Sequence, residues 1–131
     1  MLLIPDPLRD RLVANFLAGP EHDPVPVVKL YAPWGVAVWL LTELLEDGDT
    51  LFGLCDLGFG CPELGYVSLA ELVALRGPLG LGIRRDEHFA PRRPLSGYAG
   101  AARLWSRIVE DEALLADAAR HLAPLPPDPG G

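Results

Sequence analysis

The sequence predicts an α+β fold, in which a small antiparallel sheet is built around a central hairpin and flanked by helices. Three observations support this prediction. Asp47-Gly48 separates two segments rich in β-forming residues, and this dipeptide suits the positive φ angles of a tight hairpin turn. The segment Ser68-Leu69-Ala70-Glu71 is a capping box, which marks the start of a helix. Apolar residues also recur at helical spacing near both ends of the chain.

The first helix is expected between Asp6, as its N-cap, and Gly19, which precedes a proline and ends it. Leu8, Leu12 and Phe16 follow one another at intervals of four residues and therefore share a face. This stripe predicts that the helix packs against the sheet.

The central hairpin follows a proline-rich linker at residues 20–26 and a short strand at residues 27–31. Its strands are expected at residues 36–45 and 50–57. With Asp47-Gly48 as the loop, the register predicts three cross-strand pairs: Glu43 with Phe52, Trp39 with Asp56, and Leu40 with Cys55. The face that carries Trp39, Glu43, Phe52 and Asp56 would then be partly exposed to water.

The second half of the chain adds two short strands and the remaining helices. Strands are expected at residues 64–67 and 81–89, and the capped helix should end at Arg76 because Gly-Pro follows. Ser96 is a candidate cap for a C-terminal helical region, whose apolar stripe changes phase near residue 110. We therefore expect a kink there or two consecutive helices. Residues 1–123 form a single domain in this prediction, and residues 124–131 form a flexible Pro/Gly-rich tail.

The composition is that of an ordinary globular domain, because half of the 131 residues are apolar and 22% are charged. The start of the chain lacks the pattern of a signal peptide, and no apolar run is long enough to span a membrane, so a cytoplasmic location is expected. Cys55 and Cys61 lack the spacing of a zinc or redox pair, which favours reduced thiols. Cys55 is expected to be buried.

The net charge of −7 is distributed unevenly along the chain. No Lys or Arg occurs between Leu30 and Leu75, a stretch that contains the following acids: Glu43, Glu46, Asp47, Asp49, Asp56, Glu63 and Glu71. We call these residues the acidic segment. The next stretch is rich in arginine, with Arg84-Arg85 and Arg92-Arg93 close to Phe89. Such charges either solvate exposed faces or form binding patches.

The candidate site residues come from these two stretches. Glu43, Asp56 and Glu63 could bind a metal or divide acid and base roles only if they converged, and the predicted register keeps the first two apart. The four arginines Arg84, Arg85, Arg92 and Arg93 could contact phosphates, although the acidic pI near 4.8 opposes general attraction to nucleic acid. The sequence contains no Gly-x-Ser-x-Gly elbow, dinucleotide fingerprint or phosphate loop. No catalytic residue, cofactor or metal is predicted.

One stretch resembles a known family. It is Phe52-Gly-Leu-Cys-Asp-Leu-Gly-Phe-Gly-Cys-Pro-Glu-Leu-Gly-Tyr-Val-Ser-Leu-Ala-Glu-Leu72, with Trp39-Leu-Leu-Thr-Glu43 before it and Gly80-Leu-Gly-Ile-Arg-Arg-Asp-Glu-His-Phe89 after it. Together these segments resemble the uncharacterised bacterial domain-of-unknown-function family 2958. The resemblance implies a protein often encoded on plasmids and integrated elements, among replication, transfer and anti-defence genes. It implies no catalytic residues. Cys61 and Arg84 depart from the family pattern, in which an aromatic residue and an acid are usual at these positions.

Three functions are compatible with these features. The leading hypothesis is a non-enzymatic accessory protein of a bacterial mobile element that binds a protein, or another macromolecule, through an acidic surface. An anti-defence inhibitor of the anti-CRISPR or anti-restriction kind is one such protein. The first alternative is a small metal-dependent hydrolase or nuclease that uses the carboxylates. The second is a nucleic-acid binder that uses the arginine cluster.

Overall fold

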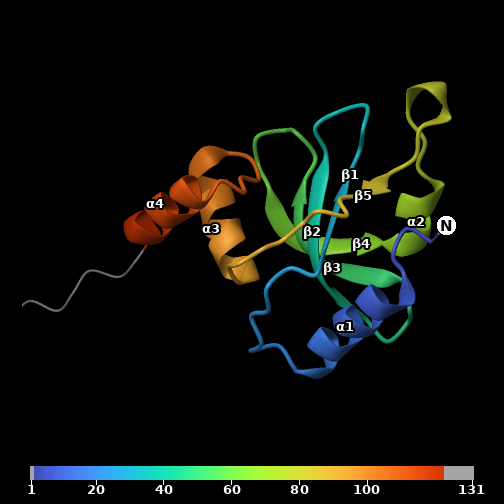
Figure 1. Cartoon of the computed structure of the whole chain (residues 1–131), viewed down its shortest axis with the longest axis horizontal. Coiled ribbons are helices and arrows are strands. Elements are labelled where there is room, and N and C mark those ends of the chain that lie inside the picture. Colours follow the sequence, from blue (N-terminus) through green and yellow to red (C-terminus); the bar gives the residue numbers. More distant parts are fainter. Residues whose placement is uncertain (1, 123–131) are drawn as a thin grey trace, which may run out of the picture.

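The computed structural model of the chain describes residues 2–122. A five-stranded sheet lies at its centre, with strand order β4-β3-β2-β1-β5 and antiparallel pairing throughout. Helices precede and follow the sheet (Figure 1), so the predicted α+β class is confirmed. The predicted tail at residues 124–131 lies outside the described residues. Among the helices of residues 2–122, none is long and apolar enough to cross a membrane.

The elements follow one another in this order: α1 (Asp6–Leu17), β1 (Val28–Tyr31), β2 (Val38–Leu44), β3 (Thr50–Asp56), β4 (Glu63–Ser68), α2 (Leu69–Ala74), the 3-10 turn η1 (Pro78–Gly80), β5 (Arg84–Arg85), α3 (Leu95–Trp105) and α4 (Glu112–Leu122).

Each face of the sheet contributes to its own apolar core. The first core joins α1 and α2 to side chains such as Trp39, Leu41 and Leu51. The second joins α3 and α4 to the opposite side of the same strands, through residues such as Leu40 and Leu54. Figure 1 shows α3 and α4 together at one end of the molecule, away from α1 and α2. The sheet is therefore covered on both faces, but by separate pairs of helices.

Helix α1 begins one residue away from its predicted cap. Pro5 occupies the N-cap position in extended conformation, and Asp6 is the first helical residue. Leu12 is completely buried, as its place in the apolar stripe predicts. Gly19 follows the helix with a φ of +97°, a conformation that glycine adopts without strain. The predicted packing of this helix on the sheet is confirmed.

The hairpin register is correct at the tip and wrong further along. Glu43 pairs with Phe52 as predicted, but the ladder shifts between Leu41 and Glu43. Asn15 Nδ2 donates to the Thr42 carbonyl at 2.9 Å, and Thr42 is buried, so the irregular position is held by α1. Beyond this bulge Trp39 pairs with Cys55 instead of Asp56. One extra residue on a strand reverses the faces of all that follow, and Trp39 therefore lies in the α1/α2 core.

Helix α2 begins at the predicted capping box, with a contribution from the hairpin tip. The Ser68 hydroxyl accepts the Glu71 backbone N–H at 3.2 Å, which is one half of the predicted box. Asp49 supplies further contacts: its carboxylate accepts the Ala70 N–H at 2.8 Å and the Ser68 hydroxyl at 2.7 Å. The helix ends at Ala74, two residues before the predicted end. The hairpin tip and the start of α2 thus form one hydrogen-bonded unit.

The strand predicted at residues 81–89 is reduced to the two residues of β5. Asp86 ends it, because its side chain accepts the His88 N–H at 2.9 Å and folds the chain into a turn.

The prediction that Ser96 caps the last helical region is also wrong. Helix α3 begins at Leu95 after Pro94, which has no side-chain cap. The Asp23 carboxylate instead accepts the Ser96 N–H at 3.1 Å, from the linker before β1. Ser106, with a φ of +59°, ends α3, and α4 follows at Glu112. Of the two expectations for this region, two consecutive helices are observed.

Candidate functional site

The three candidate carboxylates lie at separate places on the sheet. Glu43 is opposite Phe52, four residues from Asp56 along β3, which corresponds to about 13 Å at ~3.3 Å per residue. Glu63 pairs with Cys55, whose neighbour Asp56 points to the other face. Within residues 2–122 no group of three His, Cys, Asp or Glu side chains is placed to hold a metal ion. The structure therefore does not bring these acids together.

Asp56 has a structural role. It is buried, and one carboxylate oxygen accepts the Gly58 N–H at 2.9 Å while the other accepts the Ile108 N–H at 3.0 Å. The first bond shapes the turn after β3, and the second ties this turn to the connection between α3 and α4. Both oxygens are occupied by backbone groups, which leaves Asp56 unsuited to bind a partner.

Glu43 lies in a hollow on the sheet face that α3 only partly covers. The hollow has a volume of about 240 Å³ and is bounded by three parts of the chain. The sheet contributes Glu43, Phe52 and Leu64, and the linker and the start of α3 form the remaining walls, including His22 and Asp23. Glu43 is half-buried. Burial raises the pKa of its carboxyl above the ordinary value, and the opposing influence of His22 is smaller.

Aspartates and glutamates of the acidic segment differ in their contacts. All its aspartates accept hydrogen bonds: Asp47 from Thr50, Asp49 from Ser68 and Ala70, and Asp56 from Gly58 and Ile108. The Thr50 and Asp49 donors lower the pKa of Asp47. In the described part of the chain, no ion pair or side-chain hydrogen bond engages the carboxylates of Glu43, Glu46, Glu63 or Glu71. The negative charge available to a partner thus comes from the glutamates.

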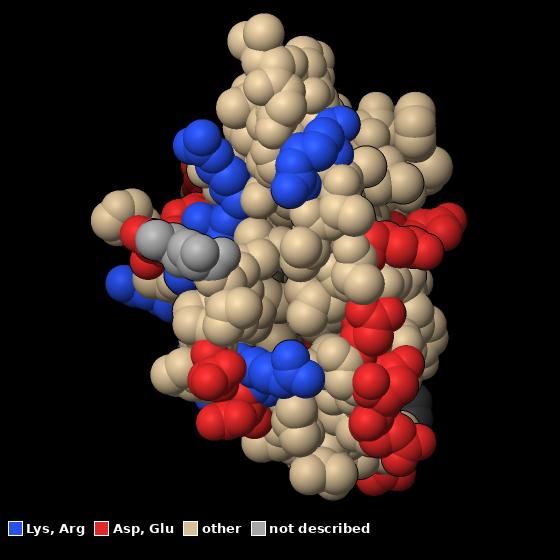
Figure 2. Space-filling view, turned by 90° about the vertical axis from the view of Figure 1, so that its right-hand side faces the viewer, with Lys and Arg blue, Asp and Glu red and all other residues tan. Residues whose placement is uncertain are grey.

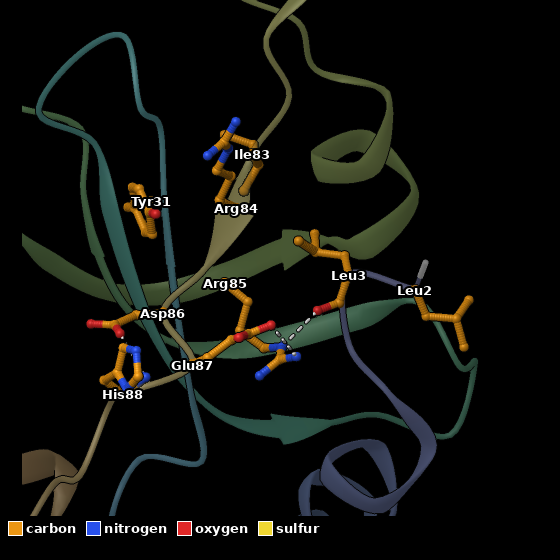
Figure 3. A pocket seen from close by; sticks show the side chains of 9 residues that line it. All are labelled: Leu2, Leu3, Tyr31, Ile83, Arg84, Arg85, Asp86, Glu87 and His88. Atoms are coloured by element: carbon orange, nitrogen blue, oxygen red, sulfur yellow. Dashed lines mark hydrogen bonds and ion pairs between the residues drawn. The ribbon is translucent and has the colours of Figure 1, made fainter.

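The arginine cluster is divided among separate structural roles. The Arg85 Nε donates to the Leu3 carbonyl at 3.1 Å, and its guanidinium lies 3.8 Å from the Glu87 carboxylate. Arg84 points away from Arg85 (Figure 3), as expected of adjacent residues on a strand. These side chains line an open cavity of about 490 Å³ beside β5, together with acids from the same segment. Its walls carry charges of both signs.

Arg93 forms an ion pair with Glu112 at the start of α4, through two guanidinium nitrogens. This contact raises the pKa of Arg93 and lowers the pKa of Glu112. Of the four candidate arginines, Arg84 and Arg92 are exposed. The arginines therefore do not form one basic patch.

The cysteines are free thiols. Cys61 is exposed, and Cys55 is half-buried rather than fully buried, because it lines an open cavity together with Leu57 and Phe59. Burial raises the pKa of the Cys55 thiol, which disfavours the reactive thiolate.

Two aromatic residues near Glu43 were not predicted as site residues. Phe52 and Tyr66 pair across β3 and β4, with ring centroids 5.1 Å apart and ring planes inclined by 52°. Tyr66 is 67% exposed. The predicted pairing of Glu43 with Phe52 was the sequence signal that could have associated an acid with an aromatic ring on this face.

The surface charge is not uniform. Figure 2 shows acidic side chains in a column along one side of the face that it presents. The lysine and arginine side chains on this face lie mostly apart from that column, and several of them lie beside acids.

Comparisons with known proteins identify the family but no activity. No curated protein and no solved structure matches the chain. A family described as "Protein of unknown function (DUF2958)" matches residues 3–109, from the segment before α1 into the connection between α3 and α4. This range is wider than the resemblance found in the sequence and leaves out α4. The chain belongs to the DUF2958 family.

Proposed function

We propose that this chain is a non-enzymatic accessory protein of bacterial mobile genetic elements that binds a basic surface of another protein. In this proposal it acts as an inhibitor of host defence, of the anti-CRISPR or anti-restriction kind. The observation that carries the binding role is the set of glutamates in the acidic segment that have no cationic partner among residues 2–122. The mobile-element context comes from the family resemblance alone.

Unpaired surface acids favour binding over catalysis for two reasons. Chemistry by paired carboxylates requires groups within a few ångström of each other, and Glu43, Asp56 and Glu63 are spread over the sheet. Acids that remain solvated can instead attract a positively charged protein surface and orient its approach. Such an interaction needs no convergence of the acids.

Neither alternative function has a specific observation in its favour. A metal-dependent hydrolase would need a cluster of ligands, which the described residues do not form. A nucleic-acid binder would need free arginines on one surface, whereas Arg85 and Arg93 are engaged within the protein. The protein-binding role therefore remains the proposal.

The test is capture of a partner from a native host with the tagged full chain, followed by elution with increasing salt. We expect a partner that is released as salt screens the charges. The double variant Glu46→Gln/Glu71→Gln should release the partner at lower salt, because both glutamates are exposed and unpaired. Asp6→Asn/Asp10→Asn is the matched control, since it removes the same charge from two exposed positions of α1 that lie outside the acidic segment and form no ion pair among residues 2–122. Absence of a partner at low salt, or equal effects of the two double variants, would contradict the proposal.

A further inference from the structure

The hollow at Glu43 has the size of a side-chain site. Its volume of about 240 Å³ is smaller than the roughly 300–1,000 Å³ of pockets that enclose drug-sized molecules. Its walls come from β2, β3, β4, the linker before β1 and the start of α3. Elements from distant parts of the sequence thus converge around one half-buried carboxylate.

The charge of the walls is negative. Glu21, Asp23 and Glu43 line the hollow with His22, and none of the residues that line it is Lys or Arg. Both carboxylate oxygens of Asp23 accept hydrogen bonds from Ser96, one from its backbone N–H and one from its hydroxyl. Glu43 is not hydrogen-bonded or ion-paired to any described side chain. Burial removes solvation from this carboxylate, the nearby His22 offsets only a smaller part of that loss, and a cation placed in the hollow would offset the rest.

The apolar walls suit the rest of a long cationic side chain. Phe52 lines the hollow beside Leu64, and Tyr66 packs against Phe52 at 5.1 Å between ring centroids. Leu64 is 43% exposed, and Tyr66, which lies beside Phe52 but outside the hollow, is 67% exposed, so the surface next to the hollow is open to an incoming chain. The methylene groups of Lys or Arg pack on such surfaces while the charged end reaches a carboxylate, and an aromatic ring nearby attracts the cation further.

From these features we propose that the hollow binds a single Lys or Arg side chain of the partner protein, with Glu43 as the residue that accepts its charge. The inference rests on the proposed protein-binding function and names the chemistry that one point of the interface recognises. Glu43 and the Phe52–Tyr66 pair give specificity to this point, whereas the exposed glutamates at the hairpin tip and α2 provide general attraction.

The test uses the full ¹⁵N-labelled chain and short peptides as probes. Acetyl-Ser-Lys-Ser-amide is titrated against its neutral analogue, in which norleucine replaces lysine, while backbone amide shifts are recorded. We expect saturable shifts at Thr42, Glu43 and Phe52 with the lysine peptide only. Glu43→Gln should weaken this binding about tenfold, the loss expected when a charged hydrogen-bond partner is removed. Glu46→Gln removes the same charge from the exposed tip and should leave the affinity unchanged.

A second variant keeps the test decisive if Glu43→Gln perturbs the fold. Leu64→Lys places a tethered cation at the rim of the hollow and should block the lysine peptide, whereas Leu64→Gln should not. Equal shifts with the norleucine peptide, or full affinity in both Glu43→Gln and Leu64→Lys, would overturn the inference. Butylammonium, which has the chemistry of a lysine side chain, should compete with the peptide for the hollow, and failure to compete would also count against the inference. If the peptide fails while Glu46→Gln/Glu71→Gln still releases a captured partner at lower salt, the proposed function stands and only the hollow is wrong.

Discussion

The acidic segment and the arginine-rich stretch carry opposite charges, but they differ more in how those charges are used. In the arginine-rich stretch, Arg85 is bound to the Leu3 carbonyl, and Arg93 pairs with Glu112. These contacts attach β5 and the chain after it to the N-terminal segment and to α4. In the acidic segment the glutamates have no such partners among residues 2–122. A run of like charge in a sequence can therefore form bonds within the protein, as in the arginine-rich stretch, or remain on the surface for a partner, as in the acidic segment.

Side-chain length explains much of the division within the acidic segment. Aspartate is short, and its carboxylate readily reaches backbone N–H groups nearby, as Asp47 does with Asp49 and Thr50. Glutamate on a strand or a helix surface extends beyond the local backbone. The aspartates consequently stabilise the fold, while the glutamates leave charge for a partner.

Removal of Asp56 tests the structural side of this division and should have the largest effect. Asp56→Ala removes a buried carboxylate that accepts the N–H groups of Gly58 and Ile108, and a hydrogen bond to a charged group contributes about 1.5–3 kcal/mol. We expect a loss of roughly 3 kcal/mol in the free energy of unfolding, measured by urea denaturation. Glu63→Ala, at the exposed start of β4, is the matched control and should change it by less than about 0.5 kcal/mol. Equal losses in the two variants would refute the division.

The local features of the fold were predictable from sequence, and the long-range ones were not. The turn at Asp47-Gly48 and the cap at Ser68 depend on a few consecutive residues, and both are present. The bulge at Thr42 depends on Asn15 of α1, which lies 27 residues away in sequence. No pattern in β2 itself indicates that contact, and so the register beyond the bulge was wrong.

The candidate site shows the same limit. The separation of Glu43 from Asp56 followed from strand geometry alone. The hollow around Glu43 could not be predicted, because its walls include the linker at Asp23, which is bound to Ser96 across 73 positions of sequence.

The Arg93–Glu112 ion pair offers a smaller test, on the arginine side of the comparison. The pKa of Glu112 is lowered by Arg93, so this contribution to stability is present above the ordinary glutamate pKa and lost as pH falls through the lowered value. Wild type should exceed Glu112→Gln in stability at neutral pH, and the difference should vanish in acid. Thermal unfolding at neutral and acidic pH measures this difference in stability. Glu110→Gln is the control for loss of charge, and it breaks the contact with Lys29 rather than the contact with Arg93. In a protein that already carries Arg93→Gln, Glu112→Gln should no longer lower stability at neutral pH. If it lowers stability by the same amount as in wild type, the ion pair is not the cause.

Glu43 provides the smallest expected change in stability and the sharpest contrast with the aspartates. Its pKa in the folded protein is raised by burial, so the folded state favours the protonated form. Stability from this group is therefore fully present below the ordinary glutamate pKa and lost as pH rises through the raised value. Glu43→Gln should be as stable as wild type in acid and slightly more stable at neutral pH, where the wild-type carboxylate is charged. His22, Glu21 and Asp23 face the same hollow, and the measurement is repeated with His22→Gln to separate its influence.

A gain in stability from Glu43→Gln would mean that the charge of Glu43 destabilises the folded protein in the absence of a partner. Asp56→Ala should move stability in the opposite direction, which makes the pair a direct test of structural against available acids. If Glu43→Gln instead loses stability at neutral pH, its carboxylate is bonded within the fold like those of the aspartates. The hollow would then have no unpaired charge to offer a lysine or arginine side chain, and the proposed contact with a partner would lose its physical basis.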